Sequence, residues 1–522
     1  MQLRPYQKEA IAAIQKHFND GELRTLLVMA TGCGKTVVFT SIAQSVVKKG
    51  GRVLILAHRE ELLMQAQDKL QKFWGIHGAI EKAEQTAVGT DASVVIASIQ
   101  TICLDARLKS YPGGTFDLII IDEAHHSVSR TYQKVLSHFG HTKVLGVTAT
   151  PERADKKYLA EIYSSIAYEY PLLQAIHDGY LVDIEVKTIP LKLDISNVKE
   201  TAGDYQLGDL GDALRPYLTQ IADTMAVECR KKRTVAFLPI VELAKEFSEM
   251  LNLRGFRAAE IDCQSENRKE LLQDFHEGKY DVICNAMILT EGFDEPSIDC
   301  IIILRPTKSR SLYQQMVGRG TRLAKNKKEL LLLDFLWLTK KHDLCRPAHL
   351  IAPTEEIAQK MTKNIIHLSE SGASMNLEKL LLKAMQESAE KEDGERYFLY
   401  DLSTKLENTE IYDYQPSFKW EKEKPTERQL NMLTRNKIDK AQITSKGLAS
   451  VIIGSIIKRR EQNKSSLKQI IYLSKKGFQK VETWSFQDAS FIMDLLARNH
   501  WNVPEWMDSK TFHPKMLKDL KR

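Results

Sequence analysis

The segment ATGCGKT at residues 30–36 places the strongest constraint on how this chain of 522 residues folds. It follows a short apolar run at 25–29 and precedes a stretch at 37–50 with helical periodicity and a closing glycine. A turn from a strand into a helix offers backbone N–H groups and the positive end of the helix dipole to a phosphate group. Gly32 and Gly34 would let the backbone approach the phosphates, Lys35 would reach the β- and γ-phosphates, and the Thr36 hydroxyl would bind Mg²⁺. The alternative is an ordinary helix N-terminus, and the preceding strand makes it less favoured.

Near-continuous apolar runs recur along the first two thirds of the chain and alternate with helical segments. A first set lies at 52–57, 93–98, 116–121 and 143–149, and a second set lies at 234–239, 281–287, 299–306 and 329–335. Strands that are buried on both faces have this composition, and they occur in parallel sheets covered by helices. The sequence therefore predicts an α/β fold with two tandem domains.

The pattern changes after these two sets, and the length is a prior for two to four domains. We expect a first α/β domain at 1–170, an interdomain linker with some helix at 171–225 and a second α/β domain at 226–350. A helical accessory segment and polar linker follow at 351–424, and a basic helical tail occupies 425–522.

The tail holds the positive charge of the protein. Residues 425–522 contain 19 Lys and Arg against 9 Asp and Glu, a net charge of +10, whereas the whole chain carries +6. The first 424 residues are therefore slightly acidic. This asymmetry indicates a tail that binds a polyanion, with a solvated lysine-rich surface as the equal alternative.

A weak internal repeat with a 40-residue period also lies in the tail. Five residues of one unit recur in the next: Gln429, Leu433, Ser445, Ala449 and Ile452 correspond to Gln469, Leu473, Ser485, Ala489 and Ile492. We interpret the repeat as two helix–turn–helix units, and chance similarity between amphipathic helices is the alternative.

Composition excludes several classes of protein. Hydrophobic residues make up 43% and charged residues 27%, which is ordinary globular usage and excludes a fully disordered chain. No apolar run reaches the roughly 18 residues of a membrane span, and the N-terminus is unlike a signal peptide, so we expect a cytoplasmic protein. The seven cysteines include no CxxC pair, which predicts neither a disulfide framework nor a zinc site.

Two adjacent carboxylates end one of the apolar runs, in the sequence FDLIIIDEAHH at 116–126. Buried carboxylates need partners, and a strand end beside a phosphate loop supplies one in Mg²⁺. Asp122 would hold the metal, and Glu123 would polarise the attacking water as general base. A helix N-cap is the alternative, and both interpretations can hold for one residue.

Two arginines three residues apart follow the second set of strands, in QQMVGRGTR at 314–322. Arg319 and Arg322 share one face of a helix or turn. From the second domain they could reach a γ-phosphate bound by the first domain and stabilise charge in the transition state, as an arginine finger does.

With these elements in order, the sequence closely resembles the superfamily 2 helicases. The segments that resemble successive helicase motifs are LRPYQ at 3–7, ATGCGKT at 30–36, LAHREELLMQ at 56–65, SIQT at 98–101, DEAH at 122–125, TATP at 148–151, AFLP at 236–239, LTEGFD at 289–294 and QQMVGRGTR at 314–322. The resemblance covers residues 3 to about 335. It implies two tandem RecA-like domains with parallel sheets, followed here by a mostly helical C-terminal region.

Within the superfamily, the chain is most similar to the RadD-like, UvsW-like and type III restriction-helicase branch, which acts on DNA. AHREEL and TAT stand where the DEAD-box RNA helicases have PTRELA and SAT. RadD carries a cysteine-rich zinc segment after the motor, and this chain has no counterpart, so a close orthologue is not expected. The tail resembles small modules with the pattern PT-x-x-Q-x-x-x-L found at the ends of assorted helicases and phage proteins.

The resemblance also implies roles for individual residues. The nucleotide-binding set is Arg4, Gln7, Thr31, Gly32, Cys33, Gly34, Lys35, Thr36 and Asp294. The set that lies along a nucleic-acid strand is His58, Arg59, Ser98, Gln100, Thr101 and Thr290. The set that couples hydrolysis to domain movement is His125, Thr148, Thr150 and Gln315. Catalysis would rest on Lys35, Glu123, Arg319 and Arg322, and the metal on Thr36 and Asp122.

The expected function is ATP- and Mg²⁺-dependent translocation on DNA, with unwinding or branch remodelling in repair, recombination or a phage or defence context. An RNA-dependent ATPase and the motor subunit of a restriction or defence complex are the alternatives. A non-catalytic scaffold is disfavoured because Lys35, Asp122, Glu123, Arg319 and Arg322 are all present. The tail is expected to hold duplex or branched DNA, or else to form a structural lid on the second domain.

Overall fold

The computed structural model describes most of the chain. The described residues are 2–149, 159–201, 204–262, 265, 267–286, 295–338, 344–369, 372–389, 395–504, 507–509 and 512–514. They divide into two compact units. The first comprises residues 1–352 and 358–381, and the second comprises residues 353–357 and 382–522.

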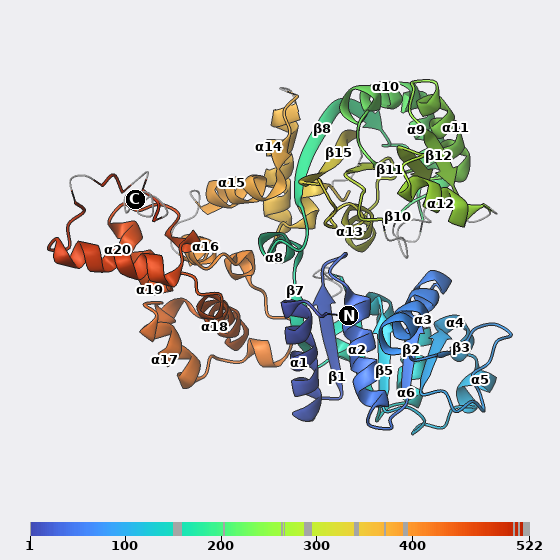
Figure 1. The fold of residues 1–522 in the computed structure, drawn as a ribbon, viewed down its shortest axis with the longest axis horizontal. Coiled ribbons are helices and arrows are strands. Elements are labelled where there is room, and N and C mark those ends of the chain that lie inside the picture. The colour runs from blue at the N-terminus through green and yellow to red at the C-terminus, as the bar shows by residue number, and fades with distance from the viewer. Residues whose placement is uncertain are drawn as a thin grey trace. The chain divides into compact units, whose positions relative to one another are not determined.

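The first α/β domain contains a parallel seven-stranded sheet with the strand order β3-β4-β2-β5-β6-β1-β7 (Figure 1). Its strands are β1 (Arg24–Met29), β2 (Val53–Ala57), β3 (Ala79–Glu81), β4 (Val94–Ser98), β5 (Leu118–Asp122), β6 (Lys143–Thr148) and β7 (Ser165–Tyr170). Residues of β2, β4 and β5 are buried throughout, as expected for strands covered on both faces. The adjacent parallel strands β1, β5 and β6 bring the phosphate loop and the DEAH segment to the same edge of the sheet.

The second α/β domain contains a sheet of the same size with the order β12-β13-β11-β14-β15-β8-β16, in which only β16 is antiparallel. Its strands are β8 (Asp183–Asp194), β11 (Thr234–Phe237), β12 (Ala258–Ile261), β13 (Val282–Asn285), β14 (Cys300–Ile303), β15 (Glu329–Leu338) and β16 (Met375–Asn376). The two sheets confirm the predicted fold class of tandem RecA-like domains.

The segment 171–225 is not a linker, contrary to the expectation from the sequence. Strand β8 pairs with β15 over most of its length, and the following helices bury Leu210, Leu218 and Met225 in the core of the second domain. The sequence conceals β8 because its burial alternates along the strand and then changes phase near Pro190. The second domain therefore begins near residue 183.

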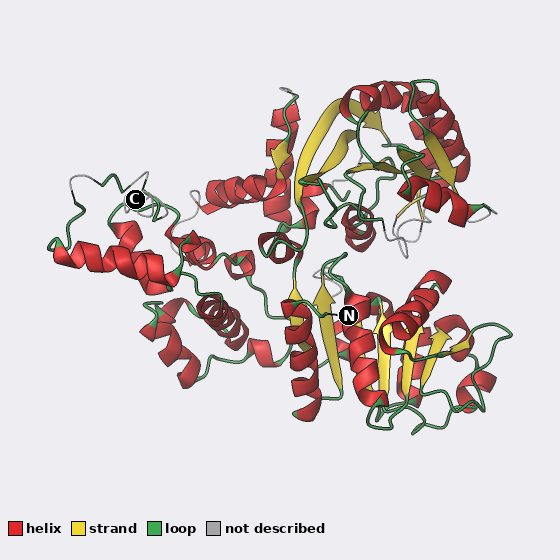
Figure 2. Ribbon diagram, in the orientation of Figure 1, coloured by secondary structure: helices red, strands yellow, loops and turns green. Residues whose placement is uncertain are grey.

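Helices cover both sheets (Figure 2). In the first domain they are α1 (Pro5–Asn19), α2 (Lys35–Val47), α3 (Glu60–Trp74), α4 (Ile99–Ile102), α5 (Asp105–Lys109), α6 (Arg130–His138) and α8 (Leu172–His177). In the second domain they are α9 (Leu207–Leu214), α10 (Leu218–Glu228), α11 (Val241–Asn252), α12 (Arg268–His276) and α13 (Arg310–Gly318). Helix α1 shows the packing rule plainly, because Tyr6, Ala10, Ile14 and Phe18 recur every fourth residue and are buried.

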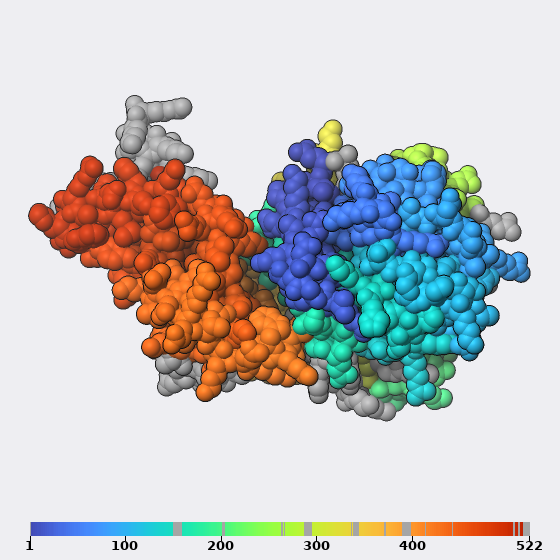
Figure 3. Space-filling view, turned by 90° about the horizontal axis from the view of Figure 1, so that it is seen from below, coloured from blue at the N-terminus to red at the C-terminus, as the bar shows by residue number. Residues whose placement is uncertain are grey.

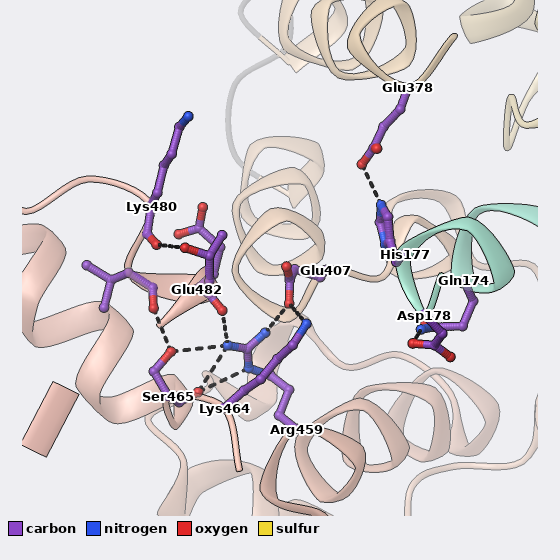
Figure 4. Close-up of polar contacts among 12 residues, drawn as sticks. Gln174, His177, Asp178, Glu378, Glu407, Arg459, Lys464, Ser465, Lys480 and Glu482 are labelled. Carbon is purple, nitrogen blue, oxygen red and sulfur yellow. Dashed lines mark hydrogen bonds and ion pairs between the residues drawn. The ribbon is translucent and has the colours of Figure 1, made fainter. Parts of the chain in front are cut away.

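Helices α14 (Glu355–Ser369) and α15 (Leu377–Ala389) lie where the chain passes from the first unit to the second. His177 of α8 and Glu378 of α15, both in the first unit, form a polar contact of 2.7 Å between Nε2 and Oε1 (Figure 4). None of the described helices is long and apolar enough to cross a membrane.

The second unit is helical and forms one packed body, coloured orange to red in Figure 3. Its main helices are α16 (Glu395–Leu406), α17 (Glu427–Arg435), α18 (Lys446–Glu461), α19 (Leu467–Lys475) and α20 (Phe486–Arg498). Helices α17 and α18 form one helix–turn–helix unit, and α19 and α20 form a second. Leu433 and Leu473, which are 40 residues apart, are both fully buried.

Candidate functional site

The phosphate loop joins β1 to α2 and is held from outside by the start of α1. Gly32 and Gly34 have φ values of +90° and +80°, in the left-handed region that glycine tolerates. The Cys33 carbonyl between them accepts hydrogen bonds from the Tyr6 hydroxyl at 2.8 Å and from Gln7 Nε2 at 3.2 Å. An added Cβ at Gly34 would lie 2.7 Å from Gln7 Nε2, so the fit of this contact depends on glycine. The loop is therefore held in shape from the side away from the cavity.

The loop opens into a cavity of about 1130 Å³ between the two α/β domains. Predicted site residues from both domains line it: Arg4, Gln7, Thr31, Gly32, Cys33, Gly34, Lys35, Thr36, Asp122, Glu123, Gln315, Arg319 and Arg322. Lys35 Nζ donates to the Met29 carbonyl at 3.4 Å. Cys33 carries no reactive thiolate, since burial raises the pKa of its thiol to about 12.

The two carboxylates lie at the end of β5, and both are buried. Asp122 Oδ1 accepts the Glu123 backbone N–H at 3.0 Å. Glu123 has φ +51° and ψ +58°, an uncommon conformation for a residue other than glycine, and its Oε2 is buried without a hydrogen bond to a described residue. Strain and an unsatisfied buried oxygen together indicate a functional position, since neither stabilises the fold. Glu123 is thus oriented by its backbone to face the cavity.

His125 connects the DEAH segment to β6. Its Nδ1 lies 3.5 Å from Glu123 Oε2 and 3.4 Å from the Thr148 hydroxyl. The two residues expected to couple hydrolysis to movement are therefore in contact with each other. A change at Glu123 can be transmitted to the end of β6 through one imidazole ring.

The segments expected to follow a nucleic-acid strand contact each other at the same edge of the first sheet. Ser98 Oγ donates to Gln100 Oε1 at 2.5 Å, and Gln100 Nε2 donates to the His58 carbonyl at 2.9 Å. Arg59 lies directly before α3. Thr101 is buried, and its hydroxyl accepts the Ala83 backbone N–H, so that side chain supports the loop.

Two histidines beside this edge are neutral at physiological pH. The rings of His58 and His126 lie 4.2 Å apart at their centroids. Burial lowers the pKa of His58 to about 4, with a further contribution from Arg59. Burial also lowers the pKa of His126 to about 3, with a further contribution from His125.

The second domain approaches the phosphate loop through α13 and the residues after it. Gln315 and Arg319 are buried. An added Cβ at Gly318 would lie 2.5 Å from Thr31 Cβ, and one at Gly32 would lie 3.3 Å from Arg322 Cγ. The two glycines therefore permit close contact between the loop of one domain and the arginine segment of the other.

Sequence reasoning missed the aromatic residues beside the loop. Tyr180 lines the cavity, lies beneath the Arg4 guanidinium at 5.3 Å from its ring centroid, and packs edge-on against Tyr6. Tyr6 in turn stacks on Tyr170 at 4.4 Å. Tyr6 belongs to the quoted LRPYQ segment, whereas the positions of Tyr170 and Tyr180 carried no signal in the sequence.

Three predicted site residues lie outside the described residues: Thr150, Thr290 and Asp294. Their roles stay predictions.

Two family descriptions match the chain. Residues 1–153 match "Type III restriction enzyme, res subunit", and residues 218–324 match "Helicase conserved C-terminal domain". The chain belongs to the superfamily 2 helicases. Both matched regions contribute residues to the cavity described above.

Curated relatives agree with this assignment over the motor region. The chain is 35% identical over 360 residues to "Putative ATP-dependent helicase IRC3" of Saccharomyces cerevisiae, a match that covers 64% of this chain and 51% of that protein. It is 33% identical over 349 residues to "Putative mitochondrial ATP-dependent helicase irc3" of Schizosaccharomyces pombe, covering 64% and 57%. The chain thus spans little more than half the length of these relatives.

Two solved structures share the fold. A fragment of "a putative HsdR subunit of a type I restriction enzyme from Vibrio vulnificus YJ016" aligns with a TM-score of 0.51 and 27% identity over 64% of each chain. The "ATP-dependent Type ISP restriction-modification enzyme LlaBIII bound to DNA" aligns with a TM-score of 0.57 and 17% identity, covering 98% of this chain and 40% of that one. The second likeness concerns the fold alone.

Proposed function

We propose that the chain is an ATP-driven motor that moves along DNA and unwinds or remodels it. The observation that carries the proposal is the single cavity lined by a phosphate loop and two carboxylates of one domain and by two arginines of the other. Such a site hydrolyses a nucleoside triphosphate only when the domains come together, so hydrolysis and domain movement are linked.

The residues of the cavity divide the chemistry among them. Lys35 and the loop backbone would hold the phosphates, and Arg319 and Arg322 would stabilise charge on the transferred phosphoryl group. Glu123 would align and deprotonate the attacking water. Thr36 and Asp122 offer hydroxyl and carboxylate oxygens, the donors that Mg²⁺ prefers, and a bound ion would neutralise phosphate charge there. Gln7 and Arg4 would contact the adenine.

DNA is proposed as the track because the motifs resemble the DNA-acting branch. His58, Arg59, Ser98, Gln100 and Thr101 would lie along one strand, together with Thr290 of the second domain. His125, Thr148, Thr150 and Gln315 would couple hydrolysis to stepping, and Asp294 would contact the ribose. Repair, recombination or phage defence in the cytoplasm or nucleoid is the proposed setting.

A second candidate function is the motor subunit of a restriction or defence complex. It is favoured by the fold shared with an HsdR fragment over 64% of this chain. In that case the chain would need partner polypeptides to act. An RNA-dependent ATPase is the third candidate.

Rates of ATP hydrolysis with single-stranded DNA, duplex DNA, forked DNA and RNA of matched length, all at one salt concentration, test the proposal. We expect at least one DNA substrate to stimulate hydrolysis well above the RNA, and the Lys35→Ala variant to hydrolyse no ATP with any of them. Stronger stimulation by RNA would support the RNA-dependent enzyme. No stimulation at all would contradict a motor that acts alone.

A further inference from the structure

The two helix–turn–helix units of the tail are built by the same contacts. Gln429 Nε2 donates to the Lys446 carbonyl at 3.3 Å and to Ser450 Oγ at 2.9 Å. Forty residues later, Gln469 Nε2 donates to the Phe486 carbonyl at 3.2 Å and to Ser490 Oγ at 2.8 Å. Equal wiring at a fixed offset means that corresponding residues occupy corresponding places in the two units.

A buried arginine fixes one unit to the other (Figure 4). Arg459, 4% exposed, donates to Glu407 at 2.7 Å, to the Ser465 carbonyl at 3.1 Å and to the Glu482 carbonyl at 2.6 Å. Lys464 also donates to Glu407 at 2.7 Å. The two units are therefore presented as one body.

The cations of the tail follow the repeat. Of the five Lys and Arg residues at 465–504, four correspond to a Lys or Arg residue 40 positions earlier. None of the three acidic residues at 425–464 corresponds to an acidic residue in the second unit. The repeat thus preserves positive charge and not charge in general.

Three of the four repeated pairs are exposed in both units: Arg428 and Lys468, Arg435 and Lys475, and Lys440 and Lys480. Within the described part of the chain, none of these six side chains forms an ion pair. In α17 the first two positions are seven residues apart and therefore lie on one face of the helix, and the same holds in α19. We call each set of three a basic face.

Cations that support the fold behave differently. Arg459, Lys464 and Lys446 have acidic partners, and their counterparts in the second unit are Asn499, Pro504 and Phe486. Structural need therefore does not explain the three exposed pairs, since the cations with structural roles were not repeated.

We propose that the two basic faces bind the phosphate backbone of DNA, at a site separate from the motor cavity. Evenly repeated cations on a rigid body suit a polymer with evenly repeated phosphates, and two linked faces bind more tightly than either alone. The choice of DNA over other polyanions rests on the proposed function. Contacts to phosphates carry no base specificity, so binding is insensitive to sequence.

The test uses the full chain without nucleotide and measures binding of labelled duplex DNA over a range of salt concentrations. One variant replaces Arg428, Arg435 and Lys440 with Gln, a second replaces Lys468, Lys475 and Lys480 with Gln, and a third combines them. The matched control replaces Lys422, Lys424 and Arg460, which are exposed cations outside the repeated pairs, with Gln.

Each triple variant should reduce the slope of log affinity against log salt by about 2 to 3, and the combined variant by about 5, because each phosphate contact contributes about 0.9. The control should change the slope by less than about 1. An equal loss in the control, or unchanged slopes in all variants, would overturn the proposal. So would displacement of the DNA by polyglutamate at equal charge, which would indicate an acidic protein partner.

These results separate the two proposals. Shifted slopes with no DNA-stimulated hydrolysis in the unchanged chain would refute the motor and retain the basic faces. Stimulated hydrolysis with unchanged slopes would refute the basic faces alone. Unchanged thermal unfolding midpoints confirm that the variants are folded.

Discussion

At the scale of single residues, the neutral pair His58 and His126 makes the first domain sensitive to acid. Both folded pKa values lie below the ordinary 6.5, at about 4 and about 3. Between pH 6.5 and pH 4 the unfolded chain therefore binds more protons than the folded chain. Stability contributed by the neutral rings is complete above pH 6.5 and is lost as the pH falls.

Lowering the pH from 7.5 to 5.0 should therefore lower the thermal unfolding midpoint, with His126 contributing about 1–2 kcal/mol of the loss. The His126→Gln variant should show a smaller fall than the unchanged chain over the same range. The exposed His141→Gln variant is the control and should behave like the unchanged chain. An undiminished fall in His126→Gln would contradict this account.

Most cavity residues could be predicted because each belongs to a short segment whose chemistry depends on spacing. Lys35, Glu123 and Arg322 were found in this way, although they come from different elements. Tyr180 could not be found, because its place at the cavity depends on how the chain turns between α8 and β8. The close contact of Gly318 with Thr31 likewise exists only once both domains have folded.

At the scale of elements, burial on both faces decided which strands could be predicted. Strands β2, β4 and β5 are apolar throughout and were predicted directly. Strand β8 alternates in burial because only the two-residue β16 lies beyond it in the sheet. Its register against β15 also shifts once, between Phe335 and Leu336, which breaks any simple period.

Helix α13 contains the clearest element-scale test, because its last residue contacts the phosphate loop. The Gly318→Ala variant should reduce ATP hydrolysis about tenfold or more, since the added methyl group holds Thr31 away and misplaces Arg319 and Arg322. The helix itself should not be destabilised, because alanine favours a helix.

The matched control is Gly208→Ala in α9, where an added Cβ meets nothing within 4 Å. It should leave hydrolysis unchanged. Equal activity of the two variants would show that close contact between α13 and the loop is not needed for turnover.

At the scale of the whole molecule, charge separates the two functions proposed for the chain. The motor cavity needs a few cations at fixed places, and the first 424 residues as a whole are slightly acidic. The tail needs many exposed cations, and it carries them at positions set by its repeat. Sequence alone indicated a basic tail, whereas the structure identifies which of its cations have no fold to support.

The central claim is that the cavity between the α/β domains hydrolyses ATP through Glu123, and the Glu123→Gln variant tests it most directly. ATP binding should stay within about threefold of the unchanged chain, because Gln keeps the shape of the side chain, whereas DNA-stimulated hydrolysis should fall by about 10²–10⁴-fold with the loss of the general base. Near-normal stimulated hydrolysis in this variant would contradict the account.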